Sequence, residues 1–274
     1  MGVRRTERLR RRPRQPWILI LGVVVYVSVV IFAPIAALVG RTFQEGLGSV
    51  LRAAREPEFL QSLQLTLVIS LIIVVIQSVL GTATAWVLER HEFRGKSLIN
   101  SIIDLPFAVS PVVVGYMLLL LVGRSGRLAP LLEVLNLRVA FAVPGMILAT
   151  LFVTLPFMIR EMGPVIRNLD FEQEQAAATL GANRWVTFRR IVVPALRVAL
   201  VYGMALTLAR SLGEFGAVLV VGGGIIGRTE TTTLYVFRAL EERNYLEAYT
   251  AALTLGLFSV VIVSLADRLR RREE

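Results

Sequence analysis

The chain has 274 residues, enough for one large domain or two small ones. Its hydrophobic fraction of 55% and mean hydropathy of +0.67 exceed those of typical soluble proteins, and charged residues make up only 18%. These values exclude a disordered chain and argue against an ordinary soluble enzyme. The absence of cysteine excludes disulfides and thiolate chemistry, and a single histidine excludes a multi-histidine metal site.

Six stretches are long and apolar enough to cross a membrane, for which about 20 residues are needed. In chain order they cover residues 17–40, 63–88, 97–122, 140–158, 196–221 and 249–266. Pro106 and Pro111 interrupt the third stretch, and Pro144 and Pro156 lie in the fourth. Prolines are tolerated there because neighbouring helices and water satisfy the freed carbonyls. The predicted fold class is therefore an all-α integral membrane protein with six spans.

The net charge of +10 would suggest nucleic acid binding in a soluble protein, but the placement of the charges points to a membrane. The flanks on the same side of the membrane as the N-terminus carry twenty arginine or lysine residues. The flanks on the opposite side carry nine. The positive-inside rule then predicts that both termini are cytoplasmic. The predicted organisation is an arginine-rich tail (1–16), a transmembrane domain (17–266) and a short tail (267–274). The first span is interpreted as an uncleaved anchor rather than a signal peptide, since no convincing A-x-A cleavage site follows it.

Catalytic motifs are missing from the sequence. No serine–histidine–acid set or cluster of carboxylates can be assembled. The G-x-G-x-x-G pattern at Gly222, Gly224 and Gly227 has no βαβ unit around it, so a turn at a helix end is the preferred interpretation. The chain is predicted to catalyse no reaction by itself and to bind no cofactor, metal or nucleic acid.

The long loop between the fourth and fifth spans, residues 161–195, is predicted to form two short helices joined by a tight turn. Asp170 is a candidate N-cap of the first helix, which contains the alanine run 176–178. Gly181 suits the left-handed position that ends this helix, Asn183 can cap the second, and Pro194 marks the entry to the fifth span.

This loop also carries apolar side chains among its charges, at Phe171, Leu180, Trp185 and Phe188. A smooth alanine helix flanked by such side chains suits docking into a groove of a partner protein. An amphipathic helix lying on the lipid surface fits the same pattern. The residues by themselves leave both interpretations open.

The loop resembles the EAA loop of ABC importer permeases, which reads E-A-A, three residues, G, nine residues, I-x-L-P. The positions in register are Ala176, Ala177, Gly181, Ile191 and Pro194. Two positions differ, because Gln175, preceded by Glu174, replaces the glutamate and Val193 replaces the leucine. The resemblance implies that the loop couples to a cytoplasmic ATPase through Glu174, Gln175, Ala176, Ala177, Gly181 and Ala182.

Two further segments, residues 104–115 and 209–217, resemble third-span and fifth-span motifs of sulfate and molybdate permeases. Over residues 17–268 the chain is most similar to sulfate/thiosulfate permeases of the CysW type. The resemblance implies a type I importer fold in a bacterial inner membrane and a heterodimer with a CysT-type permease. It also implies an external sulfate-binding protein and two ATPase subunits that hold ATP and magnesium. A molybdate or tungstate permease, or an ATP-independent channel or secondary carrier, remains an alternative.

Arg210 and Glu214 are predicted to lie inside the fifth span, four residues apart and hence on one helix face. An ionisable residue within a span is costly unless it is paired or faces water, so the pair indicates function. The two interpretations are an ion pair that holds the bundle together and direct contact with the transported anion. Asp104, in the third span, is expected at a helix end or at the membrane interface.

Overall fold

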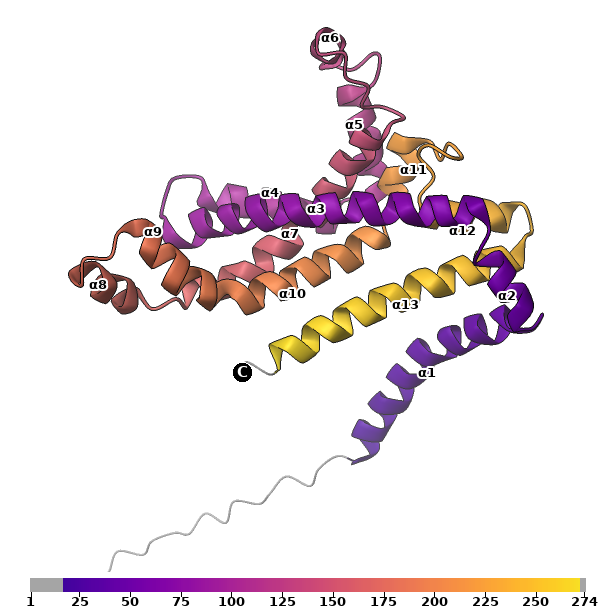
Figure 1. The fold of residues 1–274 in the computed structure, drawn as a ribbon, viewed down its shortest axis with the longest axis horizontal. Coiled ribbons are helices and arrows are strands. Elements are labelled where there is room, and N and C mark those ends of the chain that lie inside the picture. Colours follow the sequence, from indigo (N-terminus) through magenta and orange to yellow (C-terminus); the bar gives the residue numbers. More distant parts are fainter. Residues whose placement is uncertain (1–16, 272–274) are drawn as a thin grey trace, which may run out of the picture.

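The computed structural model describes residues 17–271, which form a helical bundle without a β-strand in that range (Figure 1). The elements are α1 (Trp17–Thr42), α2 (Leu47–Ala53), α3 (Pro57–Arg90), α4 (Lys96–Ala108), α5 (Pro111–Val122), α6 (Ala129–Val134), α7 (Val143–Arg167), α8 (Phe171–Thr179), α9 (Arg184–Thr187), the π-helix η1 (Phe188–Val192), α10 (Val193–Leu212), α11 (Gly216–Gly222), α12 (Thr232–Glu241) and α13 (Tyr245–Arg270). The all-helical class is confirmed. The predicted tail 1–16 and residues 272–274 lie outside the described residues.

Five helical segments are long and apolar enough to cross a membrane on their own. They are α1, α3, α7, the continuous segment Arg184–Leu212, and α13. Helices α4 and α5 pass the same test only as a pair, and they are bent by 114° relative to each other. Six spans are therefore reached only if this broken pair counts as one, and the predicted third span is not a continuous helix.

The break between α4 and α5 follows from a proline. Val109 and Ser110 have extended ψ angles of 133° and 135°, and Pro111 opens α5 as one of its first residues. A residue before proline is pushed out of the helical region by the proline ring, whereas proline itself is well tolerated in the first turn. Pro106 lies inside α4 without ending it.

The predicted fifth span, 196–221, also proves to be two helices. Helix α10 ends at Leu212, and α11 starts at Gly216 after a short non-helical segment. A Cβ atom on Gly216 would lie 2.9 Å from Cγ2 and 3.2 Å from the backbone nitrogen of Val112, so α11 begins directly against the start of α5. The prediction of one continuous span was wrong, because an apolar run does not reveal where its helix is interrupted.

The central packing of the bundle brings α3, α7 and α10 together around Met158 of α7. This side chain is fully buried. A Cβ atom would lie 2.8 Å from Met158 Cγ if built on Gly81 of α3, and 2.8 Å from its Sδ if built on Gly203 of α10. Only glycine leaves room for these two close approaches, and the flexible thioether fills the space between the helices. The surrounding core includes Ala85, Met162, Ile166 and Leu196.

Helix α1 stands apart from the bundle, with its apolar window 0% buried, and it packs mainly on α13 (Figure 1). A helix that is apolar all round must be covered by lipid or by another protein.

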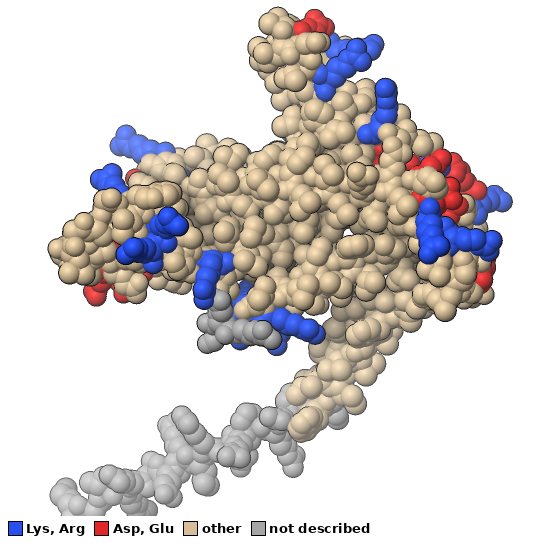
Figure 2. Space-filling model, in the orientation of Figure 1, with Lys and Arg blue, Asp and Glu red and all other residues tan. Residues whose placement is uncertain are grey.

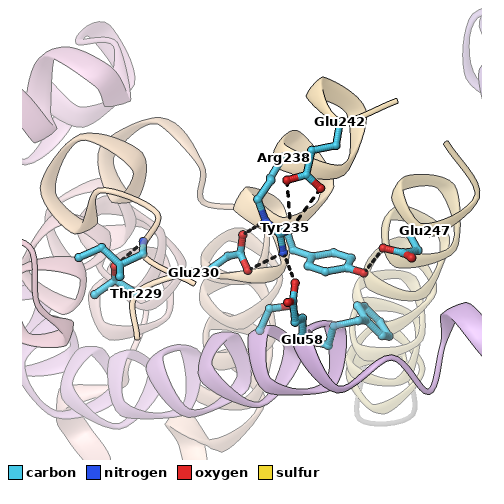
Figure 3. Close-up of polar contacts among 10 residues, drawn as sticks. Glu58, Thr229, Glu230, Tyr235, Arg238, Glu242 and Glu247 are labelled. Atoms are coloured by element: carbon cyan, nitrogen blue, oxygen red, sulfur yellow. Dashed lines mark hydrogen bonds and ion pairs between the residues drawn. The ribbon is translucent and has the colours of Figure 1, made fainter. Parts of the chain in front are cut away.

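Charged contacts join the chain segments at the end of the bundle where α3 begins (Figure 3). Arg238 of α12 contacts three carboxylates, those of Glu58, Glu230 and Glu242. Hydrogen bonding to Glu230 raises the pKa of Arg238 above its ordinary value, so the guanidinium stays charged. The Tyr235 hydroxyl donates to Glu247 at 2.7 Å, which links α12 to α13. The segment between the predicted fifth and sixth spans, residues 222–248, is therefore ordered and contains the helix α12.

Candidate functional site

Helices α8 and α9 form the hairpin expected in the loop before α10. The Asp170 carboxylate accepts a hydrogen bond from the Glu172 amide at 2.9 Å, and Asn183 Oδ1 accepts one from the Val186 amide at 2.8 Å. Both predicted caps are confirmed. Gly181 has a φ of +83°, the left-handed conformation expected for it.

The turn between the two helices has the hydrogen bonds of a Schellman motif. The Ala182 amide donates to the Ala177 carbonyl, and the Gly181 amide donates to the Ala178 carbonyl, each at 3.0 Å. These bonds satisfy carbonyls that a helix end otherwise leaves unpaired, and they require a residue with positive φ at Gly181. The hairpin is therefore a defined shape and not a loose loop.

The six predicted coupling residues fall on two faces of the hairpin. Gln175, Ala176 and Gly181 are exposed, whereas Glu174, Ala177 and Ala182 are half-buried against the chain's own helices. Leu180, at the turn, is 88% exposed. The face available to a partner is thus built from Gln175, Ala176, Leu180 and Gly181.

An ion pair that the sequence analysis missed ties the hairpin to the bundle. Arg90, the last residue of α3, lies 2.6 Å from a carboxylate oxygen of Glu174, and its guanidinium sits 4.8 Å from the centre of the Trp86 ring. A mainly apolar hollow of about 820 Å³ separates the hairpin from α3 and α10 around this contact. The pair joins residues 84 positions apart, so no local pattern in the sequence indicates it.

The hairpin continues without interruption into the membrane-spanning helix. Residues Arg184–Leu212 form one helical segment of 29 residues that includes the π-turn η1. Pro194 follows this turn and has no amide hydrogen, and the Val193 amide bonds five residues back to the Phe188 carbonyl. A proline that cannot donate is a common cause of such local widening. Pro194 therefore adjusts the helix at its entry to the span without breaking it.

Arg210 and Glu214 do form an ion pair, with 2.9 Å between Nη1 and Oε2. The two residues do not share a helix face, contrary to the prediction, because α10 ends at Leu212 and Glu214 lies beyond that end. Its other carboxylate oxygen accepts a hydrogen bond from the Ala217 amide at 3.1 Å, and its carbonyl accepts one from the Thr233 hydroxyl at 2.7 Å. Glu214 therefore satisfies an amide in the first turn of α11 and connects three chain segments.

A second ion pair joins α4 to α7. Arg160 of α7 donates to both carboxylate oxygens of Asp104 on α4, at 2.9 and 2.6 Å, and both side chains are partly exposed. Asp104 does not lie at a helix end, because α4 continues to Ala108, and its expected place at the membrane interface stays a prediction. Arg160 lies two residues beyond the predicted fourth span, in the part of α7 that continues to Arg167.

Comparison with known proteins agrees with this architecture. The sequence model of a family described as binding-protein-dependent transport system inner membrane component matches residues 77–272. The chain is 44% identical to the sulfate transport system permease protein CysW of Synechococcus elongatus, covering 90% of this chain and 86% of that protein. It is 34% identical to the sulfate transport system permease protein CysT of Escherichia coli K12, covering 90% and 89%.

A similar fold is found in a bacterial alginate ABC transporter that was crystallised with its alginate-bound periplasmic protein. One of its chains matches with a TM-score of 0.76 at 18% identity, covering 93% of each chain. At that identity the likeness concerns the fold alone. The family model and the CysW relative carry the assignment, and the chain belongs to the family of inner membrane components of binding-protein-dependent transport systems.

Proposed function

We propose that this chain is the CysW-type membrane subunit of an ATP-driven importer of sulfate and thiosulfate. The observation that carries the proposal is the 44% identity to a CysW protein over 90% of the chain, against 34% to a CysT protein. The chain is a transport component and not an enzyme. Hydrolysis belongs to partner subunits, which hold ATP and magnesium.

The complete transporter contains a pair of permeases, ATPase subunits and a binding protein. The second permease is of the CysT type, two cytoplasmic ATPases drive transport, and an external sulfate-binding protein delivers the anion. The complex lies in the bacterial inner membrane with both termini of this chain in the cytoplasm. The positive-inside charge distribution supports this orientation.

Coupling runs from the exposed face of the hairpin into the membrane. Gln175, Ala176 and Gly181 dock in a groove of the ATPase, and Glu174, Ala177 and Ala182 support them from the inner side. Because the helix is continuous from Arg184 to Leu212, a displacement of the hairpin shifts the helix break that follows Leu212. The hollow of about 820 Å³ leaves space for the movement, and the Arg90–Glu174 pair limits it.

The Arg210–Glu214 pair stabilises the break between α10 and α11. Glu214 neutralises Arg210 and would repel a dianion placed beside it. Its contacts to the Ala217 amide and the Thr233 hydroxyl support a structural role. Direct contact of Arg210 with the anion is the alternative, and it predicts a different phenotype for the neutralised variant.

The identity of the anion is tested by transport. The reconstituted complex, with its second permease, ATPase and binding protein, is supplied with radiolabelled sulfate, thiosulfate or molybdate. We expect ATP-dependent uptake of sulfate and thiosulfate, and no uptake when ATP is omitted. Uptake of molybdate alone would assign the chain to a molybdate or tungstate permease, because tetrahedral dianions need similar hydrogen-bond donors. Uptake without ATP would indicate a channel or secondary carrier.

A further inference from the structure

Helices α10 and α13 run side by side and enclose a small hollow near the end of α13 (Figure 1). This α10–α13 hollow has a volume of about 140 Å³. Its lining is formed by apolar and cationic side chains, namely Val198, Val201, Ala266 and Leu269 together with Arg197 and Arg270. The hollow therefore combines an apolar lining with one arginine from each helix.

The depth of the hollow follows from the charges of α13. Residues 248–266 contain no charged side chain, and Glu247 and Asp267 flank this stretch. At about 1.5 Å per residue the stretch spans about 28 Å, close to the hydrocarbon thickness of about 30 Å. Three arginines follow within four residues of Asp267. The hollow, which is lined by Ala266 and Arg270, thus lies where the hydrocarbon core ends and the lipid headgroups begin.

Contacts between the two helices place α10 at the same level. The Arg270 guanidinium sits 4.8 Å from the centre of the Tyr202 ring, and tyrosine is typical of the membrane–water interface. Arg197 precedes Tyr202 by five residues and so lies about 7 Å nearer to the coupling hairpin. Residues 184–197 form about three and a half turns of one continuous helix. The turn of the hairpin, at Gly181, therefore lies well beyond the headgroup level, and the hollow is separate from it.

The charges around the hollow suit a phosphate diester. Arg197 is exposed, and the Arg270 side chain is 41% exposed. Arg270 also lies 3.4 Å from a carboxylate oxygen of Glu161, whereas Asp267 is bound by Arg271 at 3.0 Å. A guanidinium has five N–H donors and binds phosphate through two parallel hydrogen bonds. Each of the two arginines can therefore hold a phosphate oxygen in addition to its contacts within the chain.

From the hollow towards the middle of the membrane, α13 presents an apolar stripe. Leu257, Val261, Leu265 and Leu269 are spaced four residues apart, so they lie on one face of the helix, and each is at least 46% exposed. The stripe extends about 18 Å from the hollow. An acyl chain attached to a phosphate in the hollow can lie along it, whereas a soluble anion has no part that would contact it.

We infer that the α10–α13 hollow binds the headgroup of an anionic phospholipid. The phosphate lies between Arg197 and Arg270, and one acyl chain lies along the stripe of α13. Basic pockets between membrane helices are suited to such headgroups. The bound lipid ties α13 to the part of α10 that continues into the coupling hairpin. The site does not depend on which anion is transported, and only its place in the cytoplasmic leaflet rests on the proposed orientation.

The test uses the full-length chain in its purified complex, reconstituted in symmetric phosphatidylcholine vesicles that contain a small fraction of brominated lipid. Val261→Cys, the only cysteine of this chain, carries a small fluorophore about 12 Å from Leu269 along the stripe. The signal is the difference from a complex treated in the same way without this cysteine. We expect phosphatidylglycerol brominated in mid-chain to quench it more strongly than brominated phosphatidylcholine at equal mole fraction. Symmetric vesicles make the result independent of the orientation.

Arg197→Gln/Arg270→Gln should weaken the apparent affinity for phosphatidylglycerol about 30-fold. Arg197→Gln alone should weaken it about fivefold, and this variant leaves the Arg270–Glu161 contact in place should the double variant be unstable. Arg268→Gln/Arg271→Gln is the matched control, because it removes two arginines from the same end of α13 that do not line the hollow. The control should change the affinity by no more than about threefold, since charges more than about 8 Å away are screened at physiological salt.

Equal quenching by the two lipids in the wild type would overturn the inference. Equal losses in the two double variants would also overturn it, because they would show a diffuse attraction and not a site. Loss of the preference on adding inorganic phosphate would indicate a site for free anions, and shielding of the fluorophore from both lipids would indicate a protein neighbour. Either result would reject the lipid site. ATP-dependent sulfate uptake, measured in the same vesicles, reports on the proposed function separately.

Discussion

At the scale of single residues, two pairs of oppositely charged side chains lie on the apolar helices and at their ends. Arg210 meets Glu214, and Arg160 meets Asp104 through two hydrogen bonds. Leaving one such charge without its partner in the membrane is more costly than removing both. The pairs therefore explain how an apolar bundle keeps these residues.

Neutralisation of Arg210 and Glu214 tests the structural role of their pair. Arg210→Gln and Glu214→Gln should each destabilise the protein by about 3–5 kcal/mol, because each leaves a largely buried charge unpaired. The double variant should recover part of this loss. The measurement is the amount of protein in the membrane and its thermal stability in detergent.

The two interpretations of Arg210 predict different results. Full abundance of Arg210→Gln together with abolished sulfate uptake would reject the structural pair and favour direct contact with the anion. Glu214→Gln is informative beside it, since glutamine keeps an oxygen that can accept from the Ala217 amide while losing the charge.

At the scale of elements, the α8–α9 hairpin is a rigid projection on a long helix. Its turn is held by the Schellman bonds, and its base is held by the Arg90–Glu174 pair. Between Ala176 and Leu180 the exposed side chains are small, at Ala176, Ala178 and Thr179, except for Leu180 at the turn. Close packing in a partner's groove depends on both the turn geometry and the small side chains.

Variants of the hairpin test its coupling role. Gly181→Val strains the turn, because a β-branched residue is poorly tolerated at φ +83°. Ala176→Trp places a large side chain on the exposed face. Both variants should reach the membrane but lose ATPase association or substrate-stimulated hydrolysis, whereas Gln175→Glu should be tolerated. Co-purification of the ATPase and ATP hydrolysis in proteoliposomes measure these effects.

Gly46→Val is a matched control for Gly181→Val. Gly46 has a φ of +84° and, like Gly181, no atom within 4 Å of its Cβ position, but it lies between α1 and α2. It imposes similar strain far from the hairpin and should leave ATPase association intact. Wild-type association in both Gly181→Val and Ala176→Trp would remove the coupling role from this hairpin.

At the scale of the whole molecule, α3 connects the two charged ends of the bundle. Its 34 residues extend about 50 Å, which exceeds the hydrocarbon thickness. One end contacts Arg238 through Glu58, and the other contacts Glu174 through Arg90. Figure 2 shows charged side chains at both of these ends and a surface of mostly uncharged residues between them.

Cysteine labelling tests the orientation on this naturally cysteine-free chain. Leu180→Cys, at the highly exposed tip of the hairpin, should react with a membrane-impermeant reagent only from the cytoplasmic side. Ser125→Cys, between α5 and α6, should react only from outside. Reaction of Leu180→Cys from outside in sealed cells would reverse the topology and detach the hairpin from the ATPase.

Local sequence determined the membrane class, the general position of the spans and the caps and turn of the hairpin. Each of these depends on neighbouring residues: apolar runs, Asp170 and Asn183 at helix starts, and glycine at a left-handed position. The resemblance to known permeases was likewise carried by contiguous motifs.

The tertiary structure decided where the spans are broken and which charges meet. The break before α11 places Gly216 against Val112, and the pairs Arg90–Glu174 and Arg160–Asp104 join residues far apart in the chain. An apolar run has the same composition whether its helix is straight or interrupted, and a charged residue carries no local mark of its partner. The contact that satisfies each group arises only when the helices pack together.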